Sequence, residues 1–270
     1  MTTIGPGRAA PALAVAALLA LAGCDGGGGA ADDVNGGDAA NAAGTATAPG
    51  AATATAAGGE TAAIPETDDP ALDYARLFMP ASQVTDQGVA LFRQTFDASF
   101  ASVPENVALE RARPGTQQAA REAGAAAMEA VFRRELPGIQ GRIADAVRGR
   151  ATADQFREIG RFMRTDTARA MQRGASQSIA GPAMDRAGDG GPALRAGDLA
   201  RAGAASVGAL TTEQATELQR FAATPAGQAL NEIGPVAASL VMRETNALAQ
   251  RAEPEVRAAI AKVVQERTRP

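Results

Sequence analysis

Apolar residues along most of the chain recur at every third or fourth position. Val84, Gly88, Phe92, Phe96 and Phe100 form one such stripe, which is the spacing of one face of an α-helix. Alternating apolar and polar residues, which are typical of strands, are not evident, and β-branched residues are sparse. The pattern predicts an all-α protein, a helical bundle or array. We interpret the phenylalanine stripe as core, with the lining of a ligand groove as the alternative.

The helical part of the chain is predicted to begin after Asp69-Pro70. Aspartate is a favourable N-cap, and proline suits the first position of a helix because its φ angle is already helical. Further helices are predicted at about 116–135, 138–149, 153–164, 166–180, 194–209, 212–223, 225–233, 235–250 and 254–267.

The first residues have the features of a bacterial export signal. One positive charge, Arg8, precedes an apolar stretch that is too short for a permanent membrane span. The stretch ends in Leu21-Ala22-Gly23-Cys24, which resembles the lipobox of bacterial lipoproteins. The resemblance implies removal of residues 1–23, cleavage between Gly23 and Cys24, and acylation of Cys24, for example with palmitate. Several acyl chains on Cys24 would anchor the protein stably in a membrane. The alternatives are an ordinary signal peptide with a chance cysteine and a buried apolar helix.

Residues 24–66 differ sharply in composition from the rest of the chain. They consist mainly of Gly, Ala, Thr, Asp and Asn, which bury too little apolar surface to offset the entropy of ordering, so we predict a disordered tether. Residues 25–69 carry eight acids and no base, whereas residues 70–270 carry 25 bases against 22 acids, a net charge of +3. We therefore divide the chain into a signal peptide, an acidic tether, and helical regions at 67–190 and 191–270.

A stretch of 20 residues occurs twice, at Thr152–Met171 and at Thr211–Leu230. Both copies begin with Thr-x-x-Gln, the sequence of a helix-capping box, in which threonine and glutamine bond each other's backbone amides. A second threonine in each copy, Thr165 or Thr224, is placed to cap a following helix. We predict a helix–corner–helix unit that is used twice. Seven positions are identical: Thr152/Thr211, Gln155/Gln214, Glu158/Glu217, Arg161/Arg220, Phe162/Phe221, Thr165/Thr224 and Ala170/Ala229.

The second copy resembles a bacterial envelope family known as domain of unknown function 2059. That family carries an acidic, leucine-bearing helix followed by Phe-Tyr-x-Ser/Thr-Pro-x-Gly. The matching residues here are Phe221, Thr224, Pro225 and Gly227, while Ala222 replaces the tyrosine. The first copy is more degenerate, with Met163, Asp166 and Ala168 at the Tyr, Pro and Gly positions. The resemblance implies an exported helical protein and supplies no catalytic residues, because none is established for the family.

The sequence lacks most of the residues that zinc, haem or Cys/His nucleophile chemistry requires. Histidine is absent, Cys24 is the single cysteine, and no G-x-S-x-G, S-x-x-K or phosphate-binding glycine motif occurs. We predict no catalytic residue, metal or cofactor. Paired carboxylates for glycan cleavage occur in any chain with this many acids. Glu158 and Glu217 are equivalent in the repeat, so we assign them a structural role, paired with Arg161 and Arg220 three residues on.

Arginine is concentrated around the first copy of the repeat. Ten arginines lie between Arg133 and Arg173 against five acids, and Arg157, Arg161 and Arg164 share one helix face. This face is a candidate anion-binding surface for lipid head groups, an acidic polymer or the chain's own tether. The alternative is a solvated face paired with Asp154, Glu158 and neighbouring acids. Export, the low net charge and the lack of interleaved aromatics argue against nucleic acid as a partner.

Together these features predict a membrane-anchored, periplasm-facing lipoprotein that is not an enzyme. Its helical domain would bind or scaffold another envelope component, either a protein or an anionic polymer. The alternatives are a carrier or chaperone with an apolar ligand between the repeat copies, and a carboxylate-based cell-wall hydrolase. Asp25 after the cysteine resembles the inner-membrane retention signal of enteric bacteria, a rule that varies between lineages. The sequence leaves the choice of membrane and the oligomeric state open.

Overall fold

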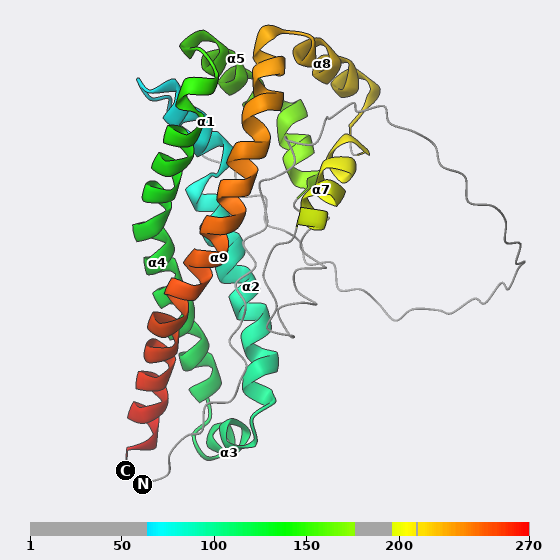
Figure 1. Ribbon diagram of the computed structural model, residues 1–270. Helices are drawn as coiled ribbons and strands as arrows, with labels where there is room; N and C mark the ends of the chain where they lie inside the picture. Colours follow the sequence, from blue (N-terminus) through cyan, green and yellow to red (C-terminus); the bar gives the residue numbers. More distant parts are fainter. Residues whose placement is uncertain (1–63, 176–195, 209, 270) are drawn as a thin grey trace, which may run out of the picture.

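The computed structural model describes residues 64–175, 196–208 and 210–269 (Figure 1). Cys24, the signal peptide and most of the predicted tether lie outside these residues. All regular secondary structure in the described part of the chain is helical, which confirms the all-α prediction. The helices in chain order are α1 (Pro70–Phe78), α2 (Ala81–Ala101), α3 (Pro104–Ala112), α4 (Thr116–Val147), α5 (Ala153–Met163), α7 (Ala196–Gly208), α8 (Thr212–Ala222) and α9 (Pro225–Thr268), with a 3-10 turn, η2 (Arg148–Arg150), after α4; residues 166–175 are also helical.

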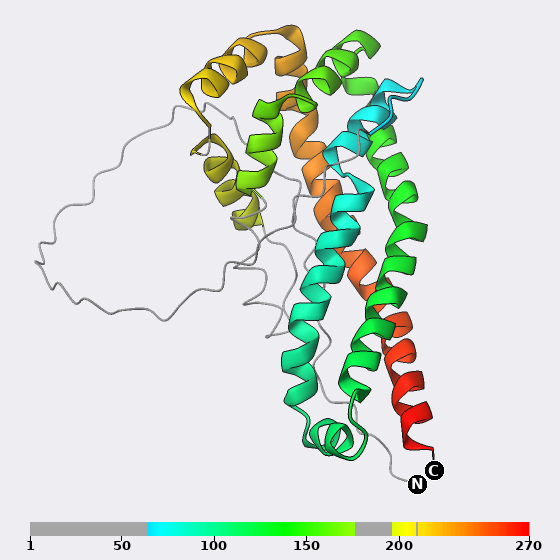
Figure 2. The same cartoon turned by 180° about the vertical axis from the view of Figure 1, so that it is seen from behind.

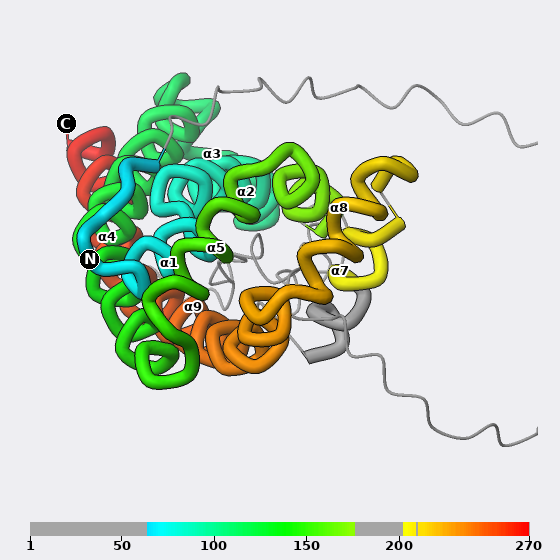
Figure 3. The backbone as a smooth tube through the Cα atoms, turned by 90° about the horizontal axis from the view of Figure 1, so that it is seen from above, coloured from blue at the N-terminus to red at the C-terminus, as the bar shows by residue number. Residues whose placement is uncertain are grey.

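The molecule is an elongated bundle built on two long helices, α4 and α9, which lie side by side (Figures 1 and 2). Helix α2 packs on the other side of α4. One end of the bundle, which we call the repeat end, carries α1, α5 and α8, and Figure 3 looks down on it. The opposite end, which we call the far end, carries α3 and the C-terminal end of α9 (Figure 1). The repeat is therefore confined to one end of the bundle.

One hydrophobic core joins the two helical regions of the sequence. Ile143 of α4, Ile159 of α5 and Ile233 of α9 all belong to it and are fully buried. The phenylalanine stripe of α2 is part of this core, which confirms the interpretation from the sequence: Phe92 and Phe96 lie 5.5 Å apart between ring centroids, and Phe96 and Phe100 lie 5.6 Å apart. Among the described helices, none is long and apolar enough to cross a membrane.

Both long helices continue through prolines at which the sequence analysis separated shorter helices. The predicted helices 116–135 and 138–149 form α4 with Pro137 inside it, and the last three predicted helices form α9 with Pro235 and Pro254 inside it. A proline within a helix costs about 3 kcal/mol. Apolar residues beside the proline offset this cost: Leu136 and Ile139 are both fully buried. Tertiary packing, which local sequence does not reveal, keeps these helices continuous.

Helix α3 was not predicted, because it buries none of its residues and so has no apolar stripe. A side chain of α3 caps the start of α4 at the far end of the bundle. The Glu110 carboxylate accepts hydrogen bonds from the amides of Gly115 and Gln117, each at 2.7 Å, and these bonds lower the pKa of Glu110. Gly115 has φ +87°, which glycine adopts without strain. Glu110 thus satisfies the start of α4, which has no side-chain cap of its own.

Candidate functional site

Both copies of the repeat begin with the predicted capping box. In the first copy the Thr152 hydroxyl accepts from the Gln155 amide at 3.2 Å, and the Gln155 side chain accepts from the Thr152 amide at 2.7 Å. The corresponding distances for Thr211 and Gln214 are 3.3 Å and 3.0 Å. Each box satisfies two amides that would otherwise lack a partner at the start of α5 or α8. The prediction is confirmed in both copies.

The corner that follows is also formed in both copies. The Thr165 hydroxyl accepts from the Ala168 amide at 3.3 Å, and the Thr224 hydroxyl accepts from the Gly227 amide at 3.1 Å. A Cβ atom at Gly227 would lie 2.2 Å from the carbonyl oxygen of Phe221, so only glycine fits there. The helix–corner–helix unit is therefore present twice, and in the second copy the two helix backbones approach more closely than a side chain allows.

The two copies contact each other through equivalent residues. The rings of Phe162 and Phe221 are parallel within 1°, with centroids 4.0 Å apart. The Gln155 side chain donates to the carbonyl of Pro225 at 3.1 Å. Thr167 donates to the carboxylate of Glu217. Glu217 thus links the two copies. The predicted pairs within each helix are wrong, since within the described residues neither Glu217 with Arg220 nor Glu158 with Arg161 forms an ion pair.

The contact between the copies is nearly filled. The hollow beside the stacked rings, lined by Phe162, Met171, Leu218, Phe221, Leu230 and neighbours, has a volume of about 20 Å³. A hollow of this size holds about one water molecule. It offers no room for an acyl chain in this conformation, so it adds no support to the carrier alternative.

Most of the arginines around the first copy are engaged with acids. Hydrogen bonds from Arg142 and Arg134 of α4 hold the pKa of Glu244 and Glu255 of α9 below their ordinary values. These pairs link the two long helices across the bundle surface. Among the described residues, ion pairs are formed by seven of the ten arginines: Arg133, Arg134, Arg142, Arg148, Arg157, Arg164 and Arg169. Acids from other parts of the chain pair with these arginines. The local excess of positive charge around the first copy is therefore smaller than ten arginines against five acids indicates.

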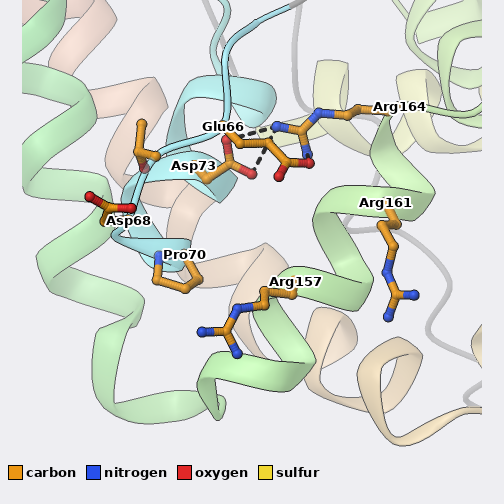
Figure 4. Close-up of a pocket in the computed structure, with 8 residues that line it drawn as sticks. Glu66, Asp68, Pro70, Asp73, Arg157, Arg161 and Arg164 are labelled. Atoms are coloured by element: carbon orange, nitrogen blue, oxygen red, sulfur yellow. Dashed lines mark hydrogen bonds and ion pairs between the residues drawn. The ribbon is translucent and has the colours of Figure 1, made fainter.

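The three arginines predicted as an anion-binding face line one hollow at the repeat end (Figure 4). The hollow has a volume of about 370 Å³, which falls in the range of about 300–1,000 Å³ typical of small-molecule sites. One wall is α5, which carries the arginines, and the other is the chain entering α1. Its lining residues are Glu66, Thr67, Asp68, Pro70, Asp73, Arg157, Arg161 and Arg164. We call it the charged hollow.

Arg164 is already neutralised at the floor of the charged hollow. One of its terminal nitrogens lies 2.8 Å and 2.9 Å from the two carboxylate oxygens of Asp73, a buried residue of α1. Gly160 makes room for this pair, since a Cβ there would lie 3.0 Å from Arg164 and 3.1 Å from Asp73. Asp73 lies 91 residues before Arg164, so no local sequence pattern indicated the pair. It joins α1 to α5 and thereby fixes the two walls.

The rim of the charged hollow holds charges that are exposed. Glu66 approaches Arg164 at 3.8 Å but is 76% exposed. Arg157 bonds Asp154 at 2.6 Å, a pair that is open to water on both sides. Arg161 and Asp68 have no ion-pair partner among the described residues. The predicted cationic face is thus half of a site whose other half is acidic, and the chain's own acidic segment supplies that half.

The charged hollow brings basic and acidic side chains together around one opening. Within the described residues no group of three or more Asp, Glu, His or Cys side chains is placed to hold a metal ion. No known protein family model, curated protein or solved structure matches the chain. The resemblance to domain of unknown function 2059 therefore depends on the repeat motif alone.

Proposed function

We propose that this protein is a lipid-anchored, periplasm-facing lipoprotein whose helical domain binds or scaffolds another component of the cell envelope without catalysing a reaction. The observation that carries the proposal is the sequence Leu21-Ala22-Gly23-Cys24 after a short apolar stretch. The acidic, glycine-rich residues that follow suit a tether, which as a coil of about 39 residues would span roughly 35 Å.

The position of the charged hollow supports a binding role. The chain enters the helical domain at Ile64 and passes directly along the hollow before α1 begins. A tether that ends there holds the repeat end nearest to its anchor. The exposed charges Arg161 and Asp68 are then placed where an envelope component can reach them.

Metabolic labelling with a palmitate analogue tests the anchor. The full-length protein should incorporate the label and fractionate with membranes, and Cys24→Ser should abolish both. Serine is nearly the same size as cysteine but lacks the thiol to which the lipid is attached. Label incorporated into the Cys24→Ser protein, or soluble full-length protein without label, would contradict the proposal.

Crosslinking in cells, followed by identification of the partner, tests the binding role. A defined envelope protein or polymer should crosslink to the full-length protein. The yield should fall when the anchor is removed by Cys24→Ser. Release of cell-wall fragments by the purified protein would favour the hydrolase alternative instead.

A further inference from the structure

The charges in the charged hollow fall into an engaged pair and an available set. Arg164 and Asp73 are bound to each other at 2.8 Å, and Asp73 is buried, so neither is free for a ligand. The available cations are Arg161, which has no ion-pair partner in the described part of the chain, and Arg157, whose bond to a 92% exposed Asp154 contributes little in water. The available anions are Asp68, which has no ion-pair partner among the described residues, and Glu66, whose exposed side chain approaches Arg164 only at 3.8 Å.

A ligand with a single charge fits this set poorly. A simple anion at Arg157 and Arg161 would lie in the same hollow as two carboxylates, and a simple cation at Glu66 and Asp68 would lie in the same hollow as two guanidiniums. A ligand that carries both charges satisfies both walls at once. We propose that the charged hollow binds a zwitterionic head group with a phosphate and an ammonium, of the phosphoethanolamine class.

The geometry of α5 suits the phosphate end. Arg157 and Arg161 are four residues apart, so their Cα atoms differ by about 6 Å along the helix axis. Arginine side chains are long, so two of them at this spacing can turn toward one phosphate and each donate to a different non-bridging oxygen. Figure 4 shows the two side chains extending from α5 in different directions and without contact to the acidic wall, so a shared phosphate requires at least one of them to rotate.

The acidic wall suits the ammonium end. Asp68 lies beside Pro70, and Pro70 separates it from Arg157 (Figure 4). The proline ring gives a short apolar surface between the two charges, against which the two methylenes of an ethanolamine group would pack. A ligand whose own charges are separated by a short apolar linker therefore matches two walls of opposite charge with a proline between them.

This inference rests on the proposed binding role, but it does not depend on the lipid anchor. The source of the head group is either a membrane aminophospholipid or a soluble phosphodiester, which share the same chemistry. A membrane source would agree with the position of the hollow at the end of the domain where the predicted tether joins.

Calorimetric titration of the full chain carrying Cys24→Ser, which cannot be acylated, tests the ligand class. Three ligands are compared at low ionic strength: glycerophosphoethanolamine, glycerol phosphate, which has only the anion, and ethanolamine, which has only the cation. Glycerophosphoethanolamine should bind on the order of tenfold more tightly than either half, because it satisfies both walls. Equal or tighter binding of glycerol phosphate, or no binding of the zwitterion, would overturn the proposal.

Matched variants locate the binding. Arg161→Gln should weaken the zwitterion and glycerol phosphate alike, whereas Asp68→Asn should weaken the zwitterion and strengthen glycerol phosphate. Arg150→Gln and Asp86→Asn remove exposed charges outside the hollow and should change neither affinity. Circular dichroism confirms that each variant is folded. Equal losses in the hollow and control variants would mean a nonspecific charge effect and would overturn the assignment.

Vesicles distinguish the two sources. The same Cys24→Ser protein is sedimented with vesicles of phosphatidylethanolamine and phosphatidylcholine, and with phosphatidylcholine alone. Retention on the ethanolamine vesicles that is lost in Arg161→Gln identifies a membrane head group, and binding of glycerophosphoethanolamine without retention identifies a soluble one. The anchor is absent in every arm, so failure here leaves the labelling test of Cys24 unaffected.

Discussion

The two copies of the repeat form the same local structure but differ in how deeply they are buried. Helix α5 buries Phe156, Ile159, Gly160, Phe162 and Met163, whereas α8 buries only Phe221. The first copy packs against α1 and α9. It also carries the arginine face of the charged hollow. The capping boxes and corners are nevertheless alike.

The difference arises at a few positions outside the conserved motif. Phe156, Ile159 and Gly160 of the first copy correspond to Ala215, Leu218 and Gln219 of the second. Phe156 contacts Tyr74 of α1, with ring centroids 5.9 Å apart, and alanine at the equivalent site has no such reach. Local motifs thus determine the shape of each unit, while the residues between them determine where the unit packs.

The largest effect is expected from truncating an apolar side chain at equivalent positions of α5 and α8, which differ in burial. Ile159→Ala should lower the free energy of unfolding by about 4 kcal/mol, because Ile159 is fully buried and its loss leaves a cavity. Leu218→Ala, at the equivalent site of the second copy, should cost only about 1 kcal/mol, since Leu218 is only partly buried. Urea unfolding followed by circular dichroism measures both. Equal losses would contradict the difference in burial.

A smaller effect is expected from exchanging the residue at the corner. Gly227→Ala should cost about 2–3 kcal/mol, because the new methyl group would meet the backbone of Phe221. The reverse exchange in the first copy, Ala168→Gly, should cost about 1 kcal/mol, from the flexibility of glycine in a helix. The same unfolding measurement applies. A neutral Gly227→Ala would show that the corner can open.

The contact between the copies is tested by a double-mutant cycle. Phe162→Leu, Phe221→Leu and the double variant should give a coupling free energy of about 0.5–1.5 kcal/mol, as expected for stacked aromatic rings. Leucine retains most of the apolar volume, so the cycle isolates the stack. A coupling near zero would mean that the two copies pack independently.

Tyr74→Phe should stabilise the protein by about 1 kcal/mol, since the buried Tyr74 hydroxyl has no hydrogen-bond partner within the described residues. Burial also raises the pKa of Tyr74 above its ordinary value of about 10. Below pH 10 the ionisation of Tyr74 therefore does not affect the free energy of unfolding. As the pH rises above 10, the free energy of unfolding falls, because the tyrosine ionises readily only in the unfolded chain.

Tyr74 is the single tyrosine, so absorbance of the phenolate reports on it directly. As the pH is raised, the phenolate signal of Tyr74 should appear only when the protein unfolds or after it has unfolded. Tyr74→Phe should flatten the loss of stability above pH 10. A phenolate signal from the folded protein near pH 10 would contradict the burial.

The smallest difference between the two copies is expected for the loss of unfolding free energy when the N-cap threonine is removed. Thr152→Ala and Thr211→Ala should each cost about 1 kcal/mol, because each removes the same hydrogen bond at the same position of a helix. The two losses should agree within about 0.5 kcal/mol. A much larger loss of unfolding free energy for Thr152→Ala would mean that the energy of the cap depends on the deeper packing of the first copy.

Features that depend on neighbours within one or two helical turns could be predicted from the sequence. The capping boxes, the threonine caps of the corner helices, the Asp69 cap of α1 and the phenylalanine stripe of α2 are all confirmed. The breaks at Pro137, Pro235 and Pro254 were wrong, because distant packing decides whether a helix continues through a proline.

For the candidate site, the sequence predicted the arginines and offered the chain's own acidic tether as one possible partner, but it missed Asp73. Arg157, Arg161 and Arg164 share a face because of helical periodicity alone. Asp73 and Glu66 reach that face only because α1 packs against α5, a contact between segments far apart in the chain. The stacking of Phe162 on Phe221 was likewise invisible, since the repeat shows that the two rings are equivalent but not that they touch.

Helix α9 makes the protein mechanically continuous from one end to the other. Its 44 residues begin at the Thr224 corner and end at the far end of the bundle (Figure 1), so the helix is about 66 Å long at 1.5 Å per residue. Pro235 and Pro254 each interrupt the backbone hydrogen bonding within this length, so packing along α4 is what keeps the helix extended. A tilt of α9 at the Thr224 corner would therefore have to break contacts with α4, which couples the position of the far end to the packing of the repeat end.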